Sequence, residues 1–137
     1  IDKIKEKIEK FVIKHYDYIF ITGGLGPTHD DVTRQSLSEL FKSKLVFLED
    51  RHLLISKKFK KVDLPKCQSE IIDLSKPLEN KVGTAVGMYF KYKRSEIIIM
   101  PGVPIEMESM LSTYLNDIKK LNSLIHNNLR FTVINVT

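Results

Sequence analysis

A short apolar run that ends in glycines constrains the fold of this chain most strongly. Tyr18–Thr22 (YIFIT) is a continuous β-prone run, and a helical pattern follows the glycines, with apolar residues at Val32, Leu37, Leu40 and Phe41. Continuous apolar strands are typical of parallel sheets, in which both faces of each strand are buried. The order of strand, glycine turn and helix therefore predicts an α/β domain.

The flanking segments predict further elements of both kinds. Isoleucines and other apolar residues at steps of three and four near the N-terminus indicate an amphipathic helix, and a strict apolar stripe after Pro104 indicates another. Two β-prone runs separated by two polar residues indicate a hairpin. The predicted elements are a helix over 1–15, strands over 18–22 and 45–47, a helix from about 49 to 60, an edge strand within 69–75, a hairpin over 85–93 and 96–100, a helix from 104 and a strand over 131–136.

Composition places the chain among ordinary globular proteins. It has 137 residues, of which 42% are hydrophobic and 28% are charged, so we expect one domain with a core of its own. Cys67 is the single cysteine, and no Cys/His cluster has zinc spacing. We therefore expect a reducing compartment, the cytoplasm.

The charge and the hydropathy of the chain limit the kinds of binding partner that we expect. The longest apolar runs are far shorter than the roughly 18 to 20 residues that a membrane span needs, so no membrane partner is expected. The net charge of +5 favours anionic ligands, but the basic residues are too dispersed to predict a nucleic-acid partner. A small anionic molecule is the partner that the composition favours.

The turn after the first strand has the chemistry of an anion site. Gly23, Gly24 and Gly26 allow positive φ angles and let backbone N–H groups approach an oxyanion. The helix that follows adds the positive end of its dipole, and the hydroxyls of Thr22 and Thr28 can add hydrogen bonds. Together these features favour a phosphate or pyrophosphate ligand.

The loop matches neither of two common phosphate motifs. A P-loop continues with Gly-Lys-Ser/Thr, whereas Pro27 and Thr28 follow Gly26 here, and a dinucleotide-binding GxGxxG motif would need glycine at His29. Ordinary NTPase and dehydrogenase functions are therefore not predicted.

Asp30 and Asp31 make the loop unusual for an anion site. Two carboxylates repel a phosphate unless a divalent cation lies between them, and Mg²⁺ can bridge carboxylate and phosphate oxygens. The alternative is that one aspartate caps the helix and the other is solvated. His29 is either an acid/base or hydrogen-bonding group or a bystander.

A second strand–turn–helix junction lies at 100–104 (MPGVP), with Glu106 in the first helical turn. Ligands of open α/β sheets bind beyond the carboxyl ends of strands, so both junctions could face one crevice. Glu106 either binds metal or substrate or stabilises the helix start. Gly83 and Thr84, in the small-residue stretch VGTAVG, allow a substrate to approach closely.

Three motifs in this order, TGGLGPTHDDVT, VGTAVG and IIIMPGVPIEM, resemble the molybdopterin-binding, molybdenum-cofactor-biosynthesis domain family. Within it the chain is most similar to the N-terminal domain of competence/damage-inducible protein A (CinA) and to the related domain of eukaryotic FAD synthases. The resemblance implies a three-layer α/β/α sandwich with a mostly parallel sheet. It also implies a homo-oligomer, a dimer or trimer, that binds a phosphorylated nucleotide or pterin over the glycine loop.

The resemblance further implies an activity. One branch of the family transfers an adenylyl group to molybdopterin, and the CinA-like branch hydrolyses pyrophosphates such as ADP-ribose or FAD with a divalent metal. GPTHDDVT favours the second branch, because the transferase pattern usually has Arg where Asp30 stands. Asp31 falls on the acidic residue near metal and phosphate, and Pro101 and Gly102 fall on the second site motif.

We therefore expect a metal-dependent nucleotide pyrophosphatase in which Asp31 and Asp30 hold Mg²⁺, Mn²⁺ or Co²⁺. The alternatives are a molybdopterin adenylyltransferase and a non-catalytic nucleotide- or pterin-binding domain. These alternatives differ in whether any reaction follows binding.

The chain departs from the family pattern in two respects. Lys81 and Val86 replace prolines that are usual around VGTA, and the opening strand with its Gly-Asp/Asn-Glu motif is absent. We expect residues 1–137 to form one molybdopterin-binding-like domain, a fragment without the family's first strand and without a C-terminal domain. Loss of that strand would leave a long apolar sheet edge exposed.

Overall fold

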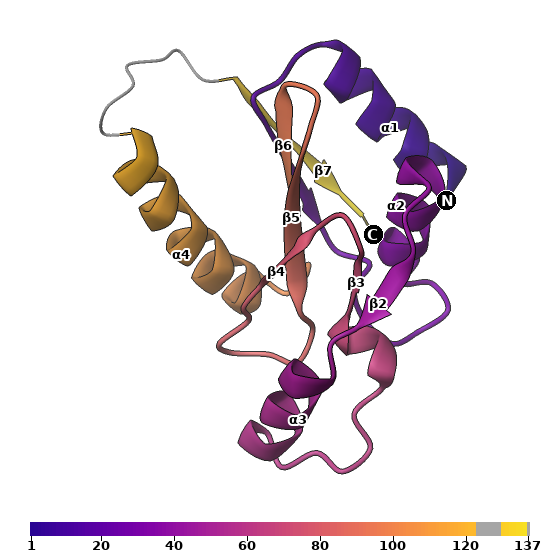
Figure 1. The fold of residues 1–137 in the computed structure, drawn as a ribbon, viewed down its shortest axis with the longest axis vertical. Helices are drawn as coiled ribbons and strands as arrows, with labels where there is room; N and C mark the ends of the chain where they lie inside the picture. The colour runs from indigo at the N-terminus through magenta and orange to yellow at the C-terminus, as the bar shows by residue number, and fades with distance from the viewer. Residues whose placement is uncertain (123–129, 137) are drawn as a thin grey trace.

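A computed structural model describes residues 1–122 and 130–136 as a mixed α/β fold (Figure 1). The elements in chain order are α1 (Asp2–Ile13), β1 (Tyr18–Thr22), α2 (Thr33–Phe41), β2 (Leu45–Phe47), α3 (Glu49–Lys58), a short 3-10 helix η1 (Lys66–Ser69), β3 (Glu70–Ile72), β4 (Lys76–Leu78), β5 (Gly87–Tyr92), β6 (Ser95–Met100), α4 (Pro104–Asn122) and β7 (Phe131–Asn135).

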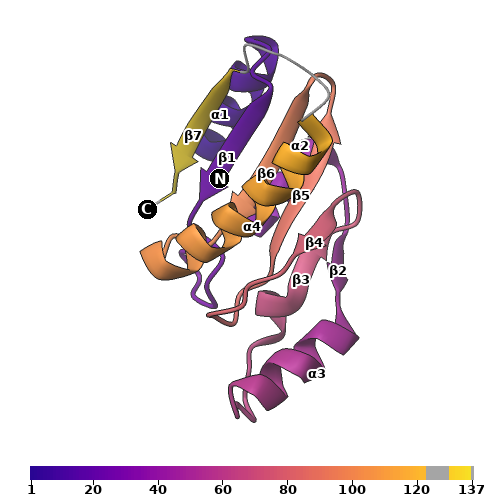
Figure 2. The same ribbon diagram turned by 90° about the vertical axis from the view of Figure 1, so that its left-hand side faces the viewer.

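One five-stranded sheet organises the fold, with the strand order β4-β5-β6-β1-β7. β1 is parallel to β6 and β7, whereas β5 is antiparallel to β4 and β6. Helices α1 and α2 cover one face and α4 covers the other (Figure 2). The predicted three-layer α/β/α class is confirmed, and the sheet is mixed because the hairpin and β4 add antiparallel pairs.

β1 is buried on both faces, as its continuous apolar sequence predicts. Ile19 and Ile21 pack in the core beneath α1 and α2, where Leu37 contributes from α2. Phe20 points to the other face and packs in the cluster that contains Met110 of α4. Because side chains alternate along the strand, β1 contributes to the hydrophobic clusters on both faces of the sheet.

β7 lies beside β1 in parallel register, from Tyr18 opposite Phe131 to Thr22 opposite Asn135. β7 therefore covers one edge of β1 with a strand of the same chain. The sheet edge is β7 itself, where the side chains of Phe131 and Val133 are 66% and 55% exposed.

A smaller unit projects beyond one end of the main sheet (Figure 2). β2 and β3 pair antiparallel in a separate two-stranded sheet, and α3, which has no buried residue, follows β2. β4 was not predicted, because Pro77 argues against a strand. The strand lies at the edge of the main sheet, where a proline without an N–H group is tolerated.

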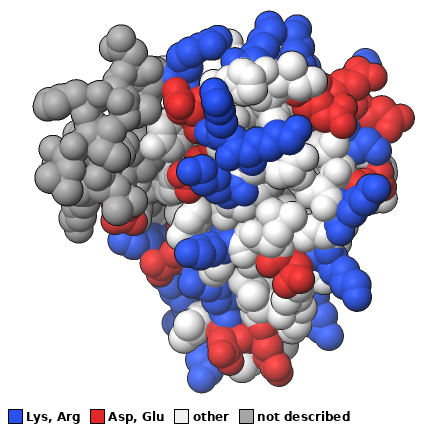
Figure 3. Space-filling model, turned by 45° about the horizontal axis from the view of Figure 1, so that its top comes forward, with Lys and Arg blue, Asp and Glu red and all other residues white. Residues whose placement is uncertain are grey.

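Charged side chains of both signs lie among uncharged ones on the face in Figure 3. Lysine and arginine side chains occupy more of this face than aspartate and glutamate do, and acidic groups lie among them (Figure 3). Within the described residues, no helix has the length and hydropathy required to cross a membrane.

Candidate functional site

A cavity of about 420 Å³ lies where β1 and β6 end. The glycine loop after β1 and the turn after β6 form two of its walls, and Glu106 of α4 faces it. Gln68 of η1 and Thr84, in the loop before β5, line the cavity as well. Both predicted strand–turn–helix junctions therefore face one cavity, at the carboxyl ends of two parallel strands.

The conformation of the loop requires its first two glycines. Gly23 and Gly24 have φ angles of +97° and +71°, which side chains rarely allow. A Cβ on Gly23 would also overlap the carbonyl oxygen of Val136, and one on Gly24 would overlap the hydroxyl of Thr33. The glycines therefore allow both the turn and its close packing.

Hydrogen bonds fix this turn to its neighbours and leave donors for a ligand. The N–H of Gly23 donates to the carbonyl of Met100 at 2.9 Å, and the hydroxyl of Thr33 donates to the carbonyl of Gly23 at 2.9 Å. The N–H groups of Gly24 and Leu25 donate to no acceptor in residues 1–122 or 130–136. Together with the free N–H groups at the start of α4, they can receive an anion.

Asp31 stabilises the loop and also lines the cavity. Its Oδ2 accepts hydrogen bonds from the backbone N–H and the hydroxyl of Thr28, at 3.0 and 2.8 Å. Partial burial is the largest single influence and raises the pKa of Asp31. The bonds from Thr28 and Gly26 and the charge of Arg34 together outweigh burial, so that the pKa lies below its usual value. Asp31 is therefore an ionised carboxylate at neutral pH.

Glu106 is the second carboxylate of the cavity, held in place by Asn80. The amide of buried Asn80 donates to Oε1 of Glu106 at 2.9 Å and to the carbonyl of Ala85 at 3.0 Å. Its carbonyl oxygen accepts the N–H groups of Val82 and Gly83. A Cβ on Gly83 would overlap the Glu106 carboxylate, so the glycine provides the space that this side chain occupies.

Asp30 lies outside the cavity that Asp31 and Glu106 face. Its side chain is 89% exposed, it lies 3.5 Å from the ring of His29, and it does not line the cavity. Among the residues that the structure describes, no group of three His, Cys, Asp or Glu side chains is placed to hold a metal. Asp31 and Glu106, rather than Asp31 and Asp30, are the carboxylates that face the cavity together.

Arg34 lies behind the loop and connects it to the smaller unit. This side chain is buried, and it donates to the carbonyls of Leu25 at 2.8 Å and Glu70 at 2.9 Å. Burial lowers the pKa of Arg34, and the nearby carboxylates of Glu70 and Asp31 oppose that effect. The guanidinium therefore fixes the position of the cavity wall relative to β3.

The structure brings most of the predicted residues together. Thr22 is buried and its hydroxyl donates to Asn135, while the hydroxyl of Thr28 is used by Asp31. Gly83 supports Glu106 without lining the cavity. The predicted residues that line it are Gly23, Gly24, Gly26, Pro27, Asp31, Thr84, Pro101, Gly102 and Glu106.

Sequence reasoning missed Arg34, Gln68 and Asn80. Position 34 lies three residues before Leu37 on the inner face of a predicted helix, and a charge there is a signal for a structural hydrogen-bond donor. Gln68 accepts the hydroxyl of Thr84 at 3.0 Å, but it lies in a segment without periodicity and carries no such signal. Asn80 carries none either.

Comparisons with known proteins identify the family to which the chain is similar. A family model described as a probable molybdopterin binding domain matches residues 1–120. A CinA-like protein of Pseudothermotoga lettingae is 36% identical over 87% of this chain and 30% of its own length. A putative competence-damage inducible protein of Listeria welshimeri is 38% identical over 84% of this chain and 29% of its own length.

A solved structure has the same fold. The crystal structure of the protein CinA, of unknown function, from Thermoplasma acidophilum has a TM-score of 0.71 and 34% identity, and the match covers 83% of this chain and 69% of that one. The chain spans less than a third of the length of the two relatives above. By its sequence and by its fold, the chain belongs to the molybdopterin-binding domain family, with CinA-like proteins among its relatives.

Proposed function

We propose that the cavity binds a nucleotide or pterin pyrophosphate together with a divalent cation and hydrolyses it in the manner of a CinA-like pyrophosphatase. One observation carries the proposal. Backbone N–H groups that suit phosphate and the carboxylates of Asp31 and Glu106 line the same cavity, and among the residues that the structure describes no lysine or arginine lines it. A cation between carboxylate and phosphate resolves this conflict of charge.

The donor set fits a metal that the substrate helps to hold. Asp31 uses Oδ2 for Thr28 and Glu106 uses Oε1 for Asn80, so each carboxylate has a second oxygen without these partners. Mg²⁺ is commonly bound by one or two carboxylates, substrate phosphate oxygens and water. Mg²⁺, Mn²⁺ or Co²⁺ would be held in this way, by Asp31, Glu106 and the substrate phosphates.

Each group then has a chemical role. The metal would neutralise charge on the phosphates and lower the pKa of a bound water. The N–H groups of Gly24 and Leu25 would stabilise negative charge that develops on a phosphate oxygen. Asp31 and Glu106 would orient the metal, and Asn80 would orient Glu106.

Hydrolysis of ADP-ribose and FAD by the chain, assayed with Mg²⁺, Mn²⁺ and Co²⁺, tests the proposal. We expect metal-dependent release of the monophosphate products and a loss of at least about 100-fold in Asp31→Ala, because the metal contact is lost. Asp30→Ala is the matched control and should keep most of the activity, since Asp30 lies outside the cavity. Equal activity in Asp31→Ala and the parent would contradict the assignment.

Molybdopterin adenylylation is the second candidate, favoured by the description of the matching family model. ATP-dependent modification of molybdopterin, without hydrolysis of ADP-ribose or FAD, would select it. Nucleotide binding without turnover under any of the three metals would leave a non-catalytic binding domain.

The proposal includes a homo-oligomer in the cytoplasm. Cys67 is a free thiol, which suits a reducing compartment. The exposed apolar edge at β7 offers a surface for a second copy.

A further inference from the structure

A second cavity, of about 310 Å³, lies near the opposite ends of β1 and β6 from the candidate site. Three tyrosines line it: Tyr18 from β1, Tyr89 from β5 and Tyr114 from α4. Three carboxylates, those of Glu79, Glu96 and Asp117, line it as well. We call it the tyrosine cavity.

The register of the sheet explains why these side chains meet. Tyr18 lies directly opposite Glu96 in the parallel β1–β6 pair, and Tyr89 lies opposite Ile98 in the antiparallel β5–β6 pair. Ile98 packs in the cluster beneath α4, so Tyr89 and Glu96 belong to the same face. Tyr114 covers them from α4.

The aromatic walls have a fixed geometry. The rings of Tyr89 and Tyr114 are 5.6 Å apart at 61°, and Tyr18 stacks on Phe20 with ring centroids 6.3 Å apart. Tyr114 is 6% exposed, and its hydroxyl is hydrogen-bonded to Glu96. Burial raises the pKa of Tyr114 above its usual value, and the charge and hydrogen bond of Glu96 raise it further. Tyr114 therefore remains a neutral donor that holds the Glu96 carboxylate at the cavity wall.

Among its described lining residues, the tyrosine cavity has an excess of negative charge, whereas the chain as a whole is positive. Three carboxylates and one guanidinium, that of Arg51, line it within the described segments, and the chain carries a net charge of +5. Arg51 forms no ion pair with any residue of the described segments. Aromatic faces and carboxylates both attract a cation that has an apolar surface.

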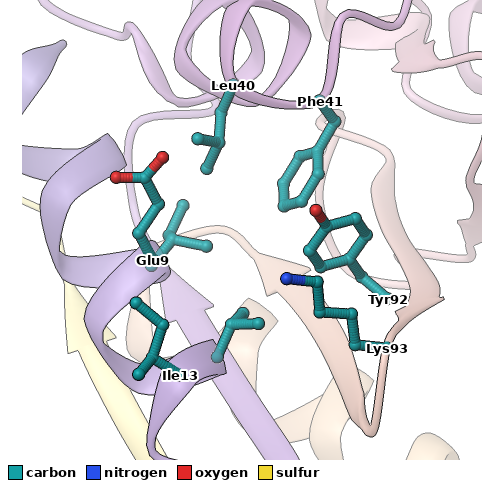
Figure 4. A pocket seen from close by; sticks show the side chains of 8 residues that line it. Glu9, Ile13, Leu40, Phe41, Tyr92 and Lys93 are labelled. Atoms are coloured by element: carbon teal, nitrogen blue, oxygen red, sulfur yellow. The ribbon is translucent and has the colours of Figure 1, made fainter.

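Another cavity, of about 330 Å³ between α1, α2 and the β5–β6 hairpin, provides a comparison (Figure 4). Its floor is aliphatic, and Phe41 and Tyr92 meet edge to face with centroids 4.8 Å apart. Glu9 and Lys93 lie on different sides of it, so one negative and one positive group balance (Figure 4). This cavity has a volume similar to that of the tyrosine cavity but no excess of carboxylates among its lining residues. We therefore do not expect it to bind a cation.

We propose that the tyrosine cavity is a binding site for a small quaternary ammonium ion. The tyrosine rings of the lining would contact the methyl groups, and the carboxylates of Glu96, Glu79 and Asp117 would neutralise the charge. A quaternary ammonium has no N–H group, so it requires no hydrogen-bond acceptor in a fixed direction. The tyrosine cavity is separate from the cavity of the candidate functional site. The proposal therefore does not depend on the function proposed for that site.

Choline is the probe, and its neutral isostere 3,3-dimethylbutan-1-ol is the matched control ligand. We expect choline to bind in the millimolar range or tighter by calorimetry and to shift tyrosine ring signals by NMR, and the isostere to bind at least about tenfold more weakly. Glu96→Gln keeps the shape and the hydrogen-bonding atom for Tyr114 but removes the charge, and it should weaken choline binding about tenfold.

Two further variants distinguish this site from a general effect of charge. Glu9→Gln removes the carboxylate of the cavity in Figure 4 and should leave choline binding unchanged. Tyr89→Leu keeps an apolar side chain at a half-buried position and should weaken choline several-fold while its circular dichroism spectrum stays that of the parent. Equal affinity for choline and the isostere, or equal loss in Glu9→Gln and Glu96→Gln, would overturn the proposal.

Discussion

At the scale of single residues, Gly24 illustrates how the loop depends on the absence of a side chain. Gly24→Ala would place a Cβ at a φ of +71° and against the Thr33 hydroxyl. We expect the free energy of unfolding to fall by about 1 to 3 kcal/mol in urea denaturation. Gly102→Ala is the control, because φ is not positive there and the new Cβ would contact only the Gly23 backbone, with 3.2 Å to its Cα. A smaller cost for Gly24→Ala than for Gly102→Ala would contradict this account.

Asp31 gives a prediction about pH. Its folded pKa lies below the unfolded value, so the carboxylate stabilises the fold above about pH 4, and this stabilisation is lost as the pH falls through the folded pKa. Thr28→Val removes the hydroxyl bond to Oδ2, so the pKa of Asp31 should rise and acid destabilisation should begin at higher pH. Carbon-13 NMR titration of the carboxyl group measures the shift. An unchanged Asp31 pKa in Thr28→Val would show that the hydroxyl bond is unimportant.

The residues of the candidate site were predictable where a motif restricts the backbone. The glycines after a buried strand and the second turn after Met100 indicated the cavity. Both are local patterns in which a strand, a turn and a helix follow one another in the sequence. The local pattern did not distinguish Asp30 from Asp31, and only the family resemblance pointed to Asp31. In the structure the hydrogen bonds from Thr28 hold the Asp31 carboxylate at the loop. Asn80 meets Glu106 across 26 residues of chain, a contact that no local pattern carries.

At the scale of elements, Arg34 joins α2 to the β2–β3 pair. A two-stranded sheet has little stability of its own, so its attachment depends on such contacts. Arg34→Lys can reach only one of the two carbonyls that Arg34 binds, and it leaves the other without a donor. We expect about 2 to 4 kcal/mol lower stability and faster amide exchange in β2 and β3.

Urea denaturation and hydrogen exchange by mass spectrometry measure these two effects. Gln35→Lys, on the exposed side of the same helix, is the control and should change stability by less than about 0.5 kcal/mol. If exchange in β3 stays at the parent rate in Arg34→Lys, the two carbonyl contacts do not hold the smaller unit in place.

The periodicity of apolar residues predicted most helices and strands. It was least informative for segments whose secondary structure depends on tertiary contacts. The bounds of β1 and β2 match the predicted ones, and the hairpin and the helix from Pro104 also formed. α1 and α3 end two residues before their predicted ends, since no strong stop signal follows them. β4 was missed because three residues with a proline become a strand only by pairing with β5.

At the scale of the whole molecule, the edge of the sheet is the feature that the sequence could not define. Parallel pairing of β7 with β1 joins segments more than a hundred residues apart, which only the folded chain reveals. Beside β7, a cavity of about 370 Å³ is lined by Phe20, Met100, Met107, Leu111, Leu115, Phe131 and Val133 with Thr22. An apolar surface beside an edge strand favours association with another strand.

We therefore expect concentration-dependent self-association through β7, because a second copy of this edge can pair with it and cover the apolar cavity. Sedimentation velocity at increasing protein concentration should show a rising sedimentation coefficient. Val133→Lys places a charge on the exposed side of β7, where the parent side chain is 55% exposed, and should keep the protein monomeric with an unchanged fold. Lys3→Glu, at an exposed position of α1, controls for a general effect of charge. If Val133→Lys associates as strongly as the parent, another surface joins the copies, and the edge of β7 is stable without a partner.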